Sequence, residues 1–464
     1  MIPMTLAEVA GVVGGRLVDG EPDLVVFVAA SDDRDCVPGT LFACIKGERV
    51  DGHDFIDSAR ERGAVACLTT RSVGSPAVVV DDVVLALGRL ASYVIQRLPG
   101  TLVLGLTGSS GKTTTKDLLA ALLRPHGETV APRGSFNSEV GLPLTVLSCT
   151  TQTRYLVLEM GMRGTGHIRY LCDIAHPKIA GVINVGSAHL ESLGSREAIA
   201  QAKGEILDGL PADGTAILFA DNPMVAALAQ RTDARVVTFG LVEGADVRAS
   251  DISLDALARP SFTLHVDGAA VPVRLTLSGE HQVANALAAT AFALAAGISL
   301  ADVVSALESY EPASKWRMEV HERSDGVIVV NDAYNANPES VRAGLNALVA
   351  MGEGRRTWAV IGEMREIGDV SADEHDTIGR LAVRLDIDRL VAVGEGARPV
   401  HLGAADEESA NEESWGGEST YVPDIDGAIA MLTEQVRPGD VVLVKASRSV
   451  GLEAVAAALL EESA

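Results

Sequence analysis

The stretch from Gly105 to Lys116, GLTGSSGKTTTK, has the residue types and spacing of a phosphate-binding loop. It follows an apolar segment that predicts a strand and opens a predicted helix, so backbone N–H groups can bind phosphate oxygens. Lys112 would reach the β- and γ-phosphates of a nucleotide, and the Thr113 hydroxyl would bind Mg²⁺. The spacing departs from the strict pattern, because Leu106 stands where the first glycine belongs. The predicted nucleotide contacts are Gly108, Ser109, Ser110, Gly111, Lys112, Thr113 and Thr114.

Two side chains at predicted strand ends near this loop could bind a metal ion. Glu159 ends the apolar segment YLVLEM, and His189 follows the segment IAGVINV. The carboxyl ends of parallel strands form the ligand-binding edge of a sheet. Beside a phosphate loop, a carboxylate suits Mg²⁺, directly or through water. We therefore predict metal ligands at Thr113, Glu159 and His189.

Further polar groups cluster at helical spacing and at strand ends. His281 and Asn285 lie one helical turn apart, so they could hydrogen-bond a base or ribose, or could cap the helix start. Three more clusters follow, in KWRMEV, VNDAYNANPES and VLVKASRS. Together they suggest a binding face that contains Arg317, Asp332, Tyr334, Asn335, Asn337, Lys445, Ser447 and Arg448.

One lysine stands where an apolar residue is expected. In SREAIAQAKGEIL, helical spacing places Lys203 on one face with Ile199, Ile206, Leu207 and Leu210. Only seven of the chain's 38 basic residues are lysines. The stem of Lys203 could pack while its ammonium reaches water, or its amine could have a chemical role.

Strand and helix signals divide the chain into three α/β domains. In residues 1–99, short apolar runs alternate with helical patterns, and a break near 96–100 predicts a linker. In residues 100–312, the alternation indicates a parallel sheet with helices on both faces, followed by a β-rich insertion and an alanine-rich helix. Residues 313–464 predict a second, doubly wound sheet. Within them, residues 403–419 are acidic and small, which is typical of a solvated loop.

Length, charge and cysteine content exclude several classes of protein. A chain of 464 residues is expected to form two to four domains. Its net charge of −25 argues against a general surface for nucleic acid or anionic membranes. The N-terminus lacks the pattern of a secretory signal, and no apolar run is long enough to span a membrane. Five scattered cysteines fit a reducing compartment, so we expect a cytoplasmic protein.

Several motifs together resemble those of the Mur ligases, over nearly the whole chain. They are TGSSGKTTTK, LVLEMG, NVGSAHLESLGSREAIAQAKGE, EHQVANALAA, VNDAYNANPES, VIGEMREIGD and VKASRS, and PGTLFACIKGERVDGHDF is similar to the family's UDP-binding domain. The resemblance implies that residues 1–99 hold a UDP-sugar peptide and that residues 100–312 form a P-loop ATPase-like domain that binds ATP. Residues 313–464 would form a Rossmann-like domain that presents the incoming amino compound and closes over ATP.

The resemblance also implies roles for single residues. Lys112 and Thr113 match the phosphate and Mg²⁺ positions, Glu159 and His189 match a second magnesium site, and Arg317 matches an arginine that reaches the ATP phosphates on closure. The remaining matches are His281 and Asn285 near the adenine, Asp332 near the ribose, Asn335, Asn337, Lys445 and Ser447 near the dipeptide, and Asp33, Arg34, Lys46, Gly47 and Asn137 on the UDP-sugar substrate.

In this family, Lys203 matches a lysine that reacts with CO₂ to form a carbamate in several members. Partial burial lowers the pKa of a lysine and frees the neutral amine that CO₂ needs. The product is an anion that could bind Mg²⁺ beside Glu159 and His189. We therefore expect two Mg²⁺ sites and a carbamylated Lys203.

Three positions depart from the family pattern. The Asp-Ser/Thr-Arg triplet near the uridine appears as Asp32-Asp33-Arg34, and the usual Asn-Asn pair is Asn137-Ser138. Trp316 stands where many relatives have glycine. The acid at Asp33 changes the expected uridine contact, and only Asn137 of the asparagine pair carries over. Trp316 directly precedes Arg317.

The implied reaction is ATP-driven amide bond formation. The terminal carboxylate of a UDP-N-acetylmuramoyl tripeptide attacks the γ-phosphate, and the amine of D-alanyl-D-alanine then displaces phosphate from the acyl phosphate. The product is the pentapeptide precursor of peptidoglycan. Charge neutralisation by Mg²⁺, Lys112 and Arg317 suits phosphoryl transfer to an anion.

Another Mur-type ligase, a folylpolyglutamate synthase-like enzyme and a catalytically silent nucleotide-binding module are the alternatives. Relatives that add diaminopimelate carry Asp-Asn-Pro-Arg in the third domain, whereas here Asp221-Asn222-Pro223 precedes Met224 in the second. YNANP and VKASRS favour the dipeptide-adding branch, and the intact phosphate loop argues against a silent module. The third residue of the tripeptide, diaminopimelate or lysine, stays open. Family members are usually monomers, and we expect one here.

Overall fold

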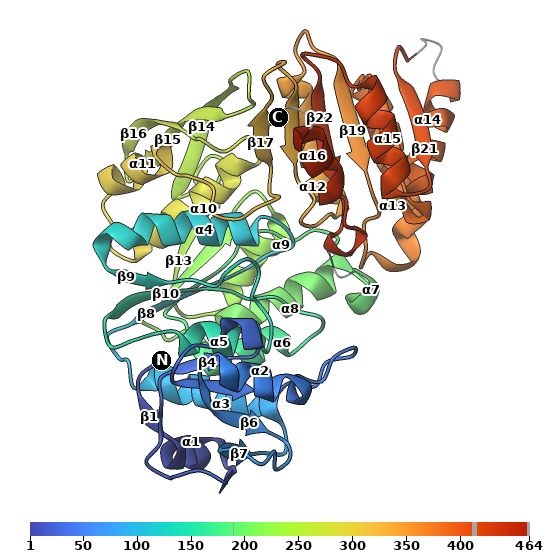
Figure 1. Cartoon of the computed structure of the whole chain (residues 1–464). Coiled ribbons are helices and arrows are strands. Elements are labelled where there is room, and N and C mark those ends of the chain that lie inside the picture. The colour runs from blue at the N-terminus through green and yellow to red at the C-terminus, as the bar shows by residue number, and fades with distance from the viewer. Residues whose placement is uncertain (189, 411–414, 462–464) are drawn as a thin grey trace.

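The computed structural model describes residues 1–188, 190–410 and 415–461. Three large sheets follow one another along the described chain, from the N-terminal unit at the bottom of Figure 1 to the C-terminal unit at its upper right. All five cysteines are buried and free. In the described part of the chain, every helix is too short or too polar to cross a membrane.

The N-terminal unit is a five-stranded sheet in the order β2-β7-β6-β5-β4, parallel except for β2. Its strands are β2 (Arg16–Val18), β4 (Val28–Ala30), β5 (Thr40–Ala43), β6 (Ala64–Thr69) and β7 (Ala77–Val79), beside a ladder of β1 (Met4–Thr5) and β3 (Val25–Val26). Its helices are α1 (Leu6–Val13), α2 (Ile56–Glu61) and α3 (Val83–Gln96). Apolar residues of α3, including Leu90 and Val94, share a core with Leu142 and Val146 of the next unit, so the two units are packed together.

The central unit is a nine-stranded sheet in the order β16-β15-β14-β13-β12-β11-β8-β10-β9. Strands β8 to β14 pair in parallel, and the predicted β-rich insertion extends the same sheet through antiparallel β15 and β16. The strands are β8 (Leu102–Thr107), β9 (Glu128–Val130), β10 (Thr153–Glu159), β11 (Ile179–Val182), β12 (Thr215–Phe219), β13 (Arg235–Gly240), β14 (Val247–Leu254), β15 (Pro260–Val266) and β16 (Ala269–Arg274). The helices are α4 (Lys112–Leu123), α5 (Gly141–Leu147), α6 (His167–Ala175), α7 (Leu190–Leu193), α8 (Arg196–Asp208), α9 (Pro223–Ala226), α10 (Gln282–Ala295) and α11 (Leu300–Glu308).

Alternation along the central strands explains why helices cover both faces of this sheet. Tyr155 and Val157 of β10 join the core on the α4 and α10 side, whereas Leu156 and Leu158 join the core that contains α5, α6 and α8. A strand that is apolar on both faces must be covered on both.

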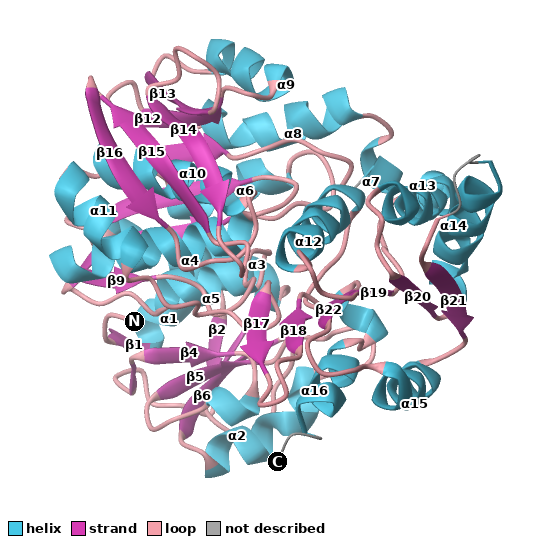
Figure 2. Cartoon of the chain, turned by 90° about the horizontal axis from the view of Figure 1, so that it is seen from above, coloured by secondary structure: helices cyan, strands magenta, loops and turns pink. Residues whose placement is uncertain are grey.

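The C-terminal unit is a six-stranded sheet in the order β17-β18-β22-β19-β20-β21, in which only β17 is antiparallel. Its strands are β17 (Glu319–Glu322), β18 (Ile328–Asn331), β19 (Thr357–Ile361), β20 (Arg389–Val393), β21 (Glu418–Val422) and β22 (Val441–Lys445). Helices α12 (Pro338–Met351), α13 (Ser371–Arg384) and α14 (Arg398–Ala410) cover one face, and α15 (Ile425–Gln435) and α16 (Glu453–Glu461) cover the other (Figure 2). The predicted doubly wound arrangement is confirmed.

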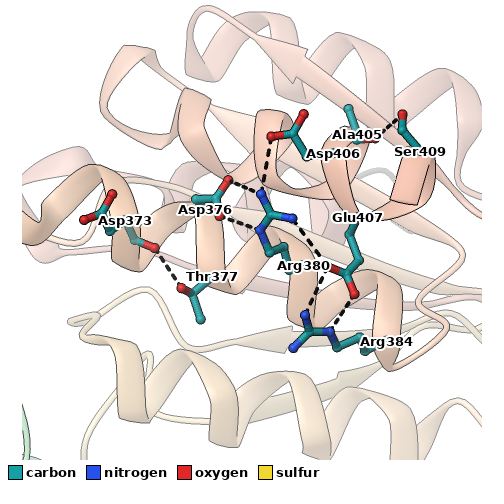
Figure 3. Close-up of polar contacts among 9 residues, drawn as sticks. All are labelled: Asp373, Asp376, Thr377, Arg380, Arg384, Ala405, Asp406, Glu407 and Ser409. Atoms are coloured by element: carbon teal, nitrogen blue, oxygen red, sulfur yellow. Dashed lines mark hydrogen bonds and ion pairs between the residues drawn. The ribbon is translucent and has the colours of Figure 1, made fainter. Parts of the chain in front are cut away.

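The expectation of a solvated loop over residues 403–419 is wrong at both ends. Helix α14 continues to Ala410, and β21 begins at Glu418. Charged side chains hold α14 against α13 (Figure 3): Arg384 Nε donates to Glu407 Oε1 at 2.7 Å, and Arg380, which is paired with Asp376 of its own helix at 2.6 Å, also reaches Asp406 of α14. Asp406 and Glu407, which belong to the acidic stretch, therefore have arginine partners on the neighbouring helix α13.

Two glycines allow this close approach, and one of them offers a stability test. A Cβ at Gly379 would overlap the carbonyl oxygen of Val400, and one at Gly403 would overlap the backbone of Asp376. We expect Gly379→Ala to lower the free energy of unfolding by about 2 kcal/mol through overpacking, measured as a lower apparent melting temperature.

The matched control is Gly11→Ala in α1, where no heavy atom lies within 4 Å of the added Cβ. Alanine has the higher helix propensity, so this variant is expected to gain about 0.5–1 kcal/mol. Equal shifts for the two variants would contradict the close α13–α14 contact.

Candidate active site

The carboxyl ends of three central strands bring the phosphate-binding loop, a carboxylate and an amide together. Strand β8 lies between β10 and β11, with Glu159 opposite Leu106 and Val182 opposite Thr107. The loop that follows β8 is therefore flanked by Glu159 at the end of β10 and by Asn184 just after β11. Because the three strands run parallel and are neighbours, their carboxyl ends lie at the same edge of the sheet.

Asn184 binds the backbone of the phosphate-binding loop. Its Oδ1 accepts hydrogen bonds from the backbone N–H groups of Ser109 and Ser110 at 2.7 and 3.0 Å, and its Nδ2 donates to Ser110 O at 3.0 Å. Gly111 has φ 74°, and a Cβ there would also overlap Asn285 Oδ1. Glycine is therefore required at the start of α4, where the loop turns into the helix.

Two lysines meet at one carbonyl oxygen of this loop. Lys112 Nζ donates to Gly108 O at 2.7 Å, and Lys203 Nζ donates to the same oxygen at 3.1 Å. The predicted helix around Lys203 is confirmed as α8, with Ser195 as its N-cap. Lys203 is 1% exposed, and burial, followed by repulsion from Lys112, holds its pKa well below the usual value. Burial also lowers the pKa of Lys112, against the attraction of Glu159.

Glu159 and Thr113 form an oxygen-rich pair at the base of the loop. The Thr113 hydroxyl donates to Glu159 Oε2 at 2.8 Å, and Asn137 Nδ2 donates to Glu159 Oε1 at 2.6 Å. Glu159 is 1% exposed. A buried carboxylate beside a hydroxyl suits Mg²⁺, which takes oxygen ligands and completes its shell with water and substrate phosphates.

The rest of the predicted metal set is not assembled by the described residues. His189 lies outside them. Among the residues that are described, three or more His, Cys, Asp or Glu side chains nowhere group in a way that could hold a metal ion.

Arg317 reaches the same region from the C-terminal unit. Its guanidinium lies 4.1 Å from the centre of the Tyr334 ring, and its Nε is buried with no hydrogen-bond partner among the described residues. The neighbouring Trp316 and Met318 have φ 60° and 50°. This left-handed backbone is the reason that glycine suits position 316, and here Trp316 stacks on Arg448 at 4.3 Å, which offsets the backbone strain.

Asp332 and Lys445 bind each other at the ends of β18 and β22. Lys445 Nζ lies 2.5 Å from Asp332 Oδ2 and also donates to Asn335 O at 3.0 Å. Ser447 does not face the cavity described below. Its hydroxyl accepts from Arg365 N at 2.9 Å and donates to Ala336 O.

The turn into α12 joins the C-terminal unit to the phosphate-binding loop. Asn337 caps α12, and its Nδ2 donates to Ser109 O at 3.4 Å. Glu339 accepts from the backbone and hydroxyl of Ser187 at 2.8 and 2.9 Å. The two units therefore meet at the cavity itself.

These groups line one cavity of about 380 Å³ between the central and C-terminal units. Most of the predicted residues line it: Ser109, Ser110, Gly111, Lys112, Thr113, Thr114, Asn137, Glu159, His281, Asn285, Arg317, Asp332, Asn335, Asn337 and Lys445.

Burial lowers the pKa of His281 to about 4, so its imidazole is neutral at pH 7, and its buried Nδ1 has no partner among the described residues. A nucleotide base could provide that partner.

Other predicted residues lie elsewhere. Gly108 and Lys203 lie behind the cavity wall rather than in it. Apart from Asn137, the predicted UDP-sugar contacts belong to the N-terminal unit, where Arg34 pairs with Asp32 and Ser58 donates to Asp33 at 2.6 Å. The backbone of Lys46, next to Gly47, pairs with that of Asp51 in an isolated antiparallel β-bridge.

Several lining residues were missed from the sequence. They are Ser135, Asn184, Gln282, Met318, Glu339 and Ser340. Asn184 follows the segment IAGVI directly, so the strand-end argument applied to His189 could have found it. Ser135 and Gln282 carry no comparable signal.

Comparison with known proteins agrees with this arrangement. Three family models match the chain: "Mur ligase family, catalytic domain" over residues 31–93, "Mur ligase middle domain" over 106–293 and "Mur ligase, glutamate ligase domain" over 316–448. The UDP-N-acetylmuramoyl-tripeptide–D-alanyl-D-alanine ligase of Mycobacterium tuberculosis is 47% identical, with 100% of this chain and 98% of that protein covered.

Solved structures give the same result. A crystal structure of MurF from Acinetobacter baumannii has a TM-score of 0.88 at 32% identity and covers 99% of both chains. MurF from Thermotoga maritima in complex with ADP has a TM-score of 0.80 at 31% identity, with 94% of this chain and 97% of that chain covered. With a phosphate-binding loop, a buried carboxylate and a C-terminal arginine at one cavity, and with similarity along its full length, this chain belongs to the Mur ligase family.

Proposed function

We propose that this chain is an ATP-dependent ligase that joins D-alanyl-D-alanine to a UDP-N-acetylmuramoyl tripeptide, a step of peptidoglycan precursor synthesis. The observation that carries the proposal is the cavity in which Lys112, Glu159 and Arg317 meet the turn of Asn335 and Asn337. The full-length relative from M. tuberculosis bears the name of this activity.

The reaction needs alignment and charge neutralisation rather than a protein nucleophile. The terminal carboxylate of the tripeptide attacks the γ-phosphorus of ATP, and ADP leaves, which yields an acyl phosphate. The amine of the dipeptide then attacks the acyl carbon, the amide bond forms, and phosphate departs while the amine loses a proton. Lys112 and Arg317 bring positive charge to the transferred phosphoryl group.

Mg²⁺ would be held by Thr113 and Glu159, which already contact each other. When bound, the ion supplies positive charge to the phosphate oxygens. A second ion would be held by His189 and a carbamylated Lys203. The depressed pKa of Lys203 supports this, because CO₂ reacts with a neutral amine.

Each of the three units is assigned one of the three substrates. We propose that residues 1–99 hold the UDP-sugar, residues 100–312 hold ATP, and residues 313–464 present the dipeptide. The specific assignments are Asp33, Arg34, Lys46, Gly47 and Asn137 for the UDP-sugar peptide, His281, Asn285 and Asp332 for the nucleotide, and Asn335, Asn337 and Lys445 for the dipeptide. Gly108 and Ser447, which lie outside the cavity lining, belong to none of these sets. The enzyme would act as a cytoplasmic monomer.

A phosphate-release assay tests the function. With UDP-N-acetylmuramoyl tripeptide, Mg²⁺-ATP and D-alanyl-D-alanine, we expect phosphate release and a pentapeptide product of matching mass. Parallel reactions with diaminopimelate- and lysine-containing tripeptides identify the third residue. Release only with a different amine, such as a free amino acid, would contradict the dipeptide assignment.

A further inference from the structure

A second buried lysine lies on α4, behind the cavity. Lys116 is 1% exposed. Its Nζ donates to Pro132 O and Gly134 O at 2.8 and 2.9 Å, and it lies 2.7 Å from Oδ1 of the neighbouring Asp117. These three partners match the three donors of an ammonium. Because a buried ion pair is often no more stabilising than apolar residues of similar volume, its presence here suggests a role beyond stability.

The carbonyls that bind this ammonium belong to a segment that reaches the cavity, residues 132–137. Ser135 Oγ lies 2.5 Å from the Tyr334 hydroxyl, which comes from the C-terminal unit. Asn137 Nδ2 donates to Glu159 Oε1 at 2.6 Å. The position of this segment therefore fixes one of the two hydrogen bonds that orient the buried carboxylate, and Thr113 makes the other.

The carboxylate of the pair binds the linker to the C-terminal unit. Asp117 Oδ2 accepts from the Ser314 hydroxyl at 2.5 Å. Three residues further along, Arg317 stacks on Tyr334, and the backbone at Trp316 between them is in the left-handed region. Asp117 is thus connected, through Ser314 and the backbone of residues 314–317, to the arginine that we assign to the phosphates.

We propose that the Lys116–Asp117 pair positions the reacting groups from behind the phosphate-binding loop: Lys116 sets the metal-side carboxylate, and Asp117 sets Arg317. Neither residue lines the cavity, so both are positioning residues. The inference rests on the proposed function. A displacement of about 1 Å in a reacting geometry can cost on the order of 100-fold in rate, which gives a reason to keep a buried pair at this place.

The double variant Lys116→Met/Asp117→Asn tests the pair as a whole, because it removes both charges and leaves no unpaired buried charge. Its melting temperature reports whether it folds. In calorimetric titrations with the non-hydrolysable β,γ-imido analogue of ATP, we expect the half-saturating Mg²⁺ concentration to rise at least about tenfold, because the segment that places Asn137 against Glu159 is no longer bound by Lys116.

Ser314→Ala tests the aspartate arm alone. We expect the Kd of the same analogue at saturating Mg²⁺ to rise about fivefold, with the half-saturating Mg²⁺ concentration unchanged. The matched control is Lys178→Met, which breaks an exposed pair with Asp213. It should leave both values within about twofold of the wild type.

A folded double variant with wild-type Mg²⁺ and nucleotide affinities overturns the inference, as does a Ser314→Ala variant with wild-type affinity. If the double variant unfolds, Ser314→Ala decides alone. The titrations involve no turnover. Absence of phosphate release by the wild-type chain would therefore overturn the proposed function and leave this test intact.

Discussion

Replacing Lys203 by methionine is expected to lower the ligase rate at least about 100-fold while raising the melting temperature. Lys203 is 1% exposed, and its stem lies on the apolar face of α8. A buried ammonium destabilises the folded state, so methionine of similar length should be more stable there. The rate falls because methionine cannot form the carbamate that we assign to the second Mg²⁺.

The stability gain has a defined pH dependence. The pKa of Lys203 is lowered on folding, so between its folded and unfolded values the unfolded chain binds more protons. The penalty of the lysine is therefore full below the folded pKa and disappears as the pH rises to its usual value of about 10.4. The advantage of Lys203→Met in CO₂-free buffer should be large at pH 7 and small near pH 10, measured by thermal unfolding.

Two further variants separate chemistry from packing. Lys203→Ala should regain part of its rate with a short-chain carboxylic acid, which replaces the carbamate. Lys203→Arg should stay inactive, and ¹³C NMR of the wild type with labelled CO₂ should show a carbamate signal. Full activity of the arginine variant would show that a carbamate is not needed.

Changing Glu159 to glutamine is expected to lower kcat on the order of 100-fold and to raise the Mg²⁺ concentration needed for half-maximal rate. The carboxylate is buried, and Thr113 and Asn137 hold its two oxygens. Glutamine keeps the shape but removes the negative charge, which is what attracts a hard cation. Rates measured over a Mg²⁺ series would show both effects.

Glu205→Gln is the matched control. Glu205 is 5% exposed, and it binds the first turn of α6 through Gly166 N at 2.7 Å and Arg169 N at 3.1 Å. Its loss should lower the melting temperature and leave the Mg²⁺ dependence unchanged. If both variants changed the Mg²⁺ dependence equally, Glu159 would have no special role in binding the ion.

Local pattern was enough to predict the elements that carry the chemistry. The turn of the phosphate-binding loop, the strand that ends at Glu159, and the helix around Lys203 all depend on residues a few positions apart. Helical and strand periodicity are properties of such short stretches. The same reasoning failed over residues 403–419, because the arginines that stabilise α14 lie on a different helix.

The partners of each side chain were decided only by the tertiary structure. Lys203 donates to Gly108, 95 residues away, and Asn337 donates to Ser109, 228 residues away. The place of Asn184 at a strand end could be read from the sequence, but its hydrogen bonds to Ser109 and Ser110 could not, and neither could the contacts of Lys116, since strand order and helix packing bring these groups together. The sequence by itself determined which groups could react and on which elements they lie. Long-range packing determined which of them meet, because hydrogen bonds form between neighbours in space.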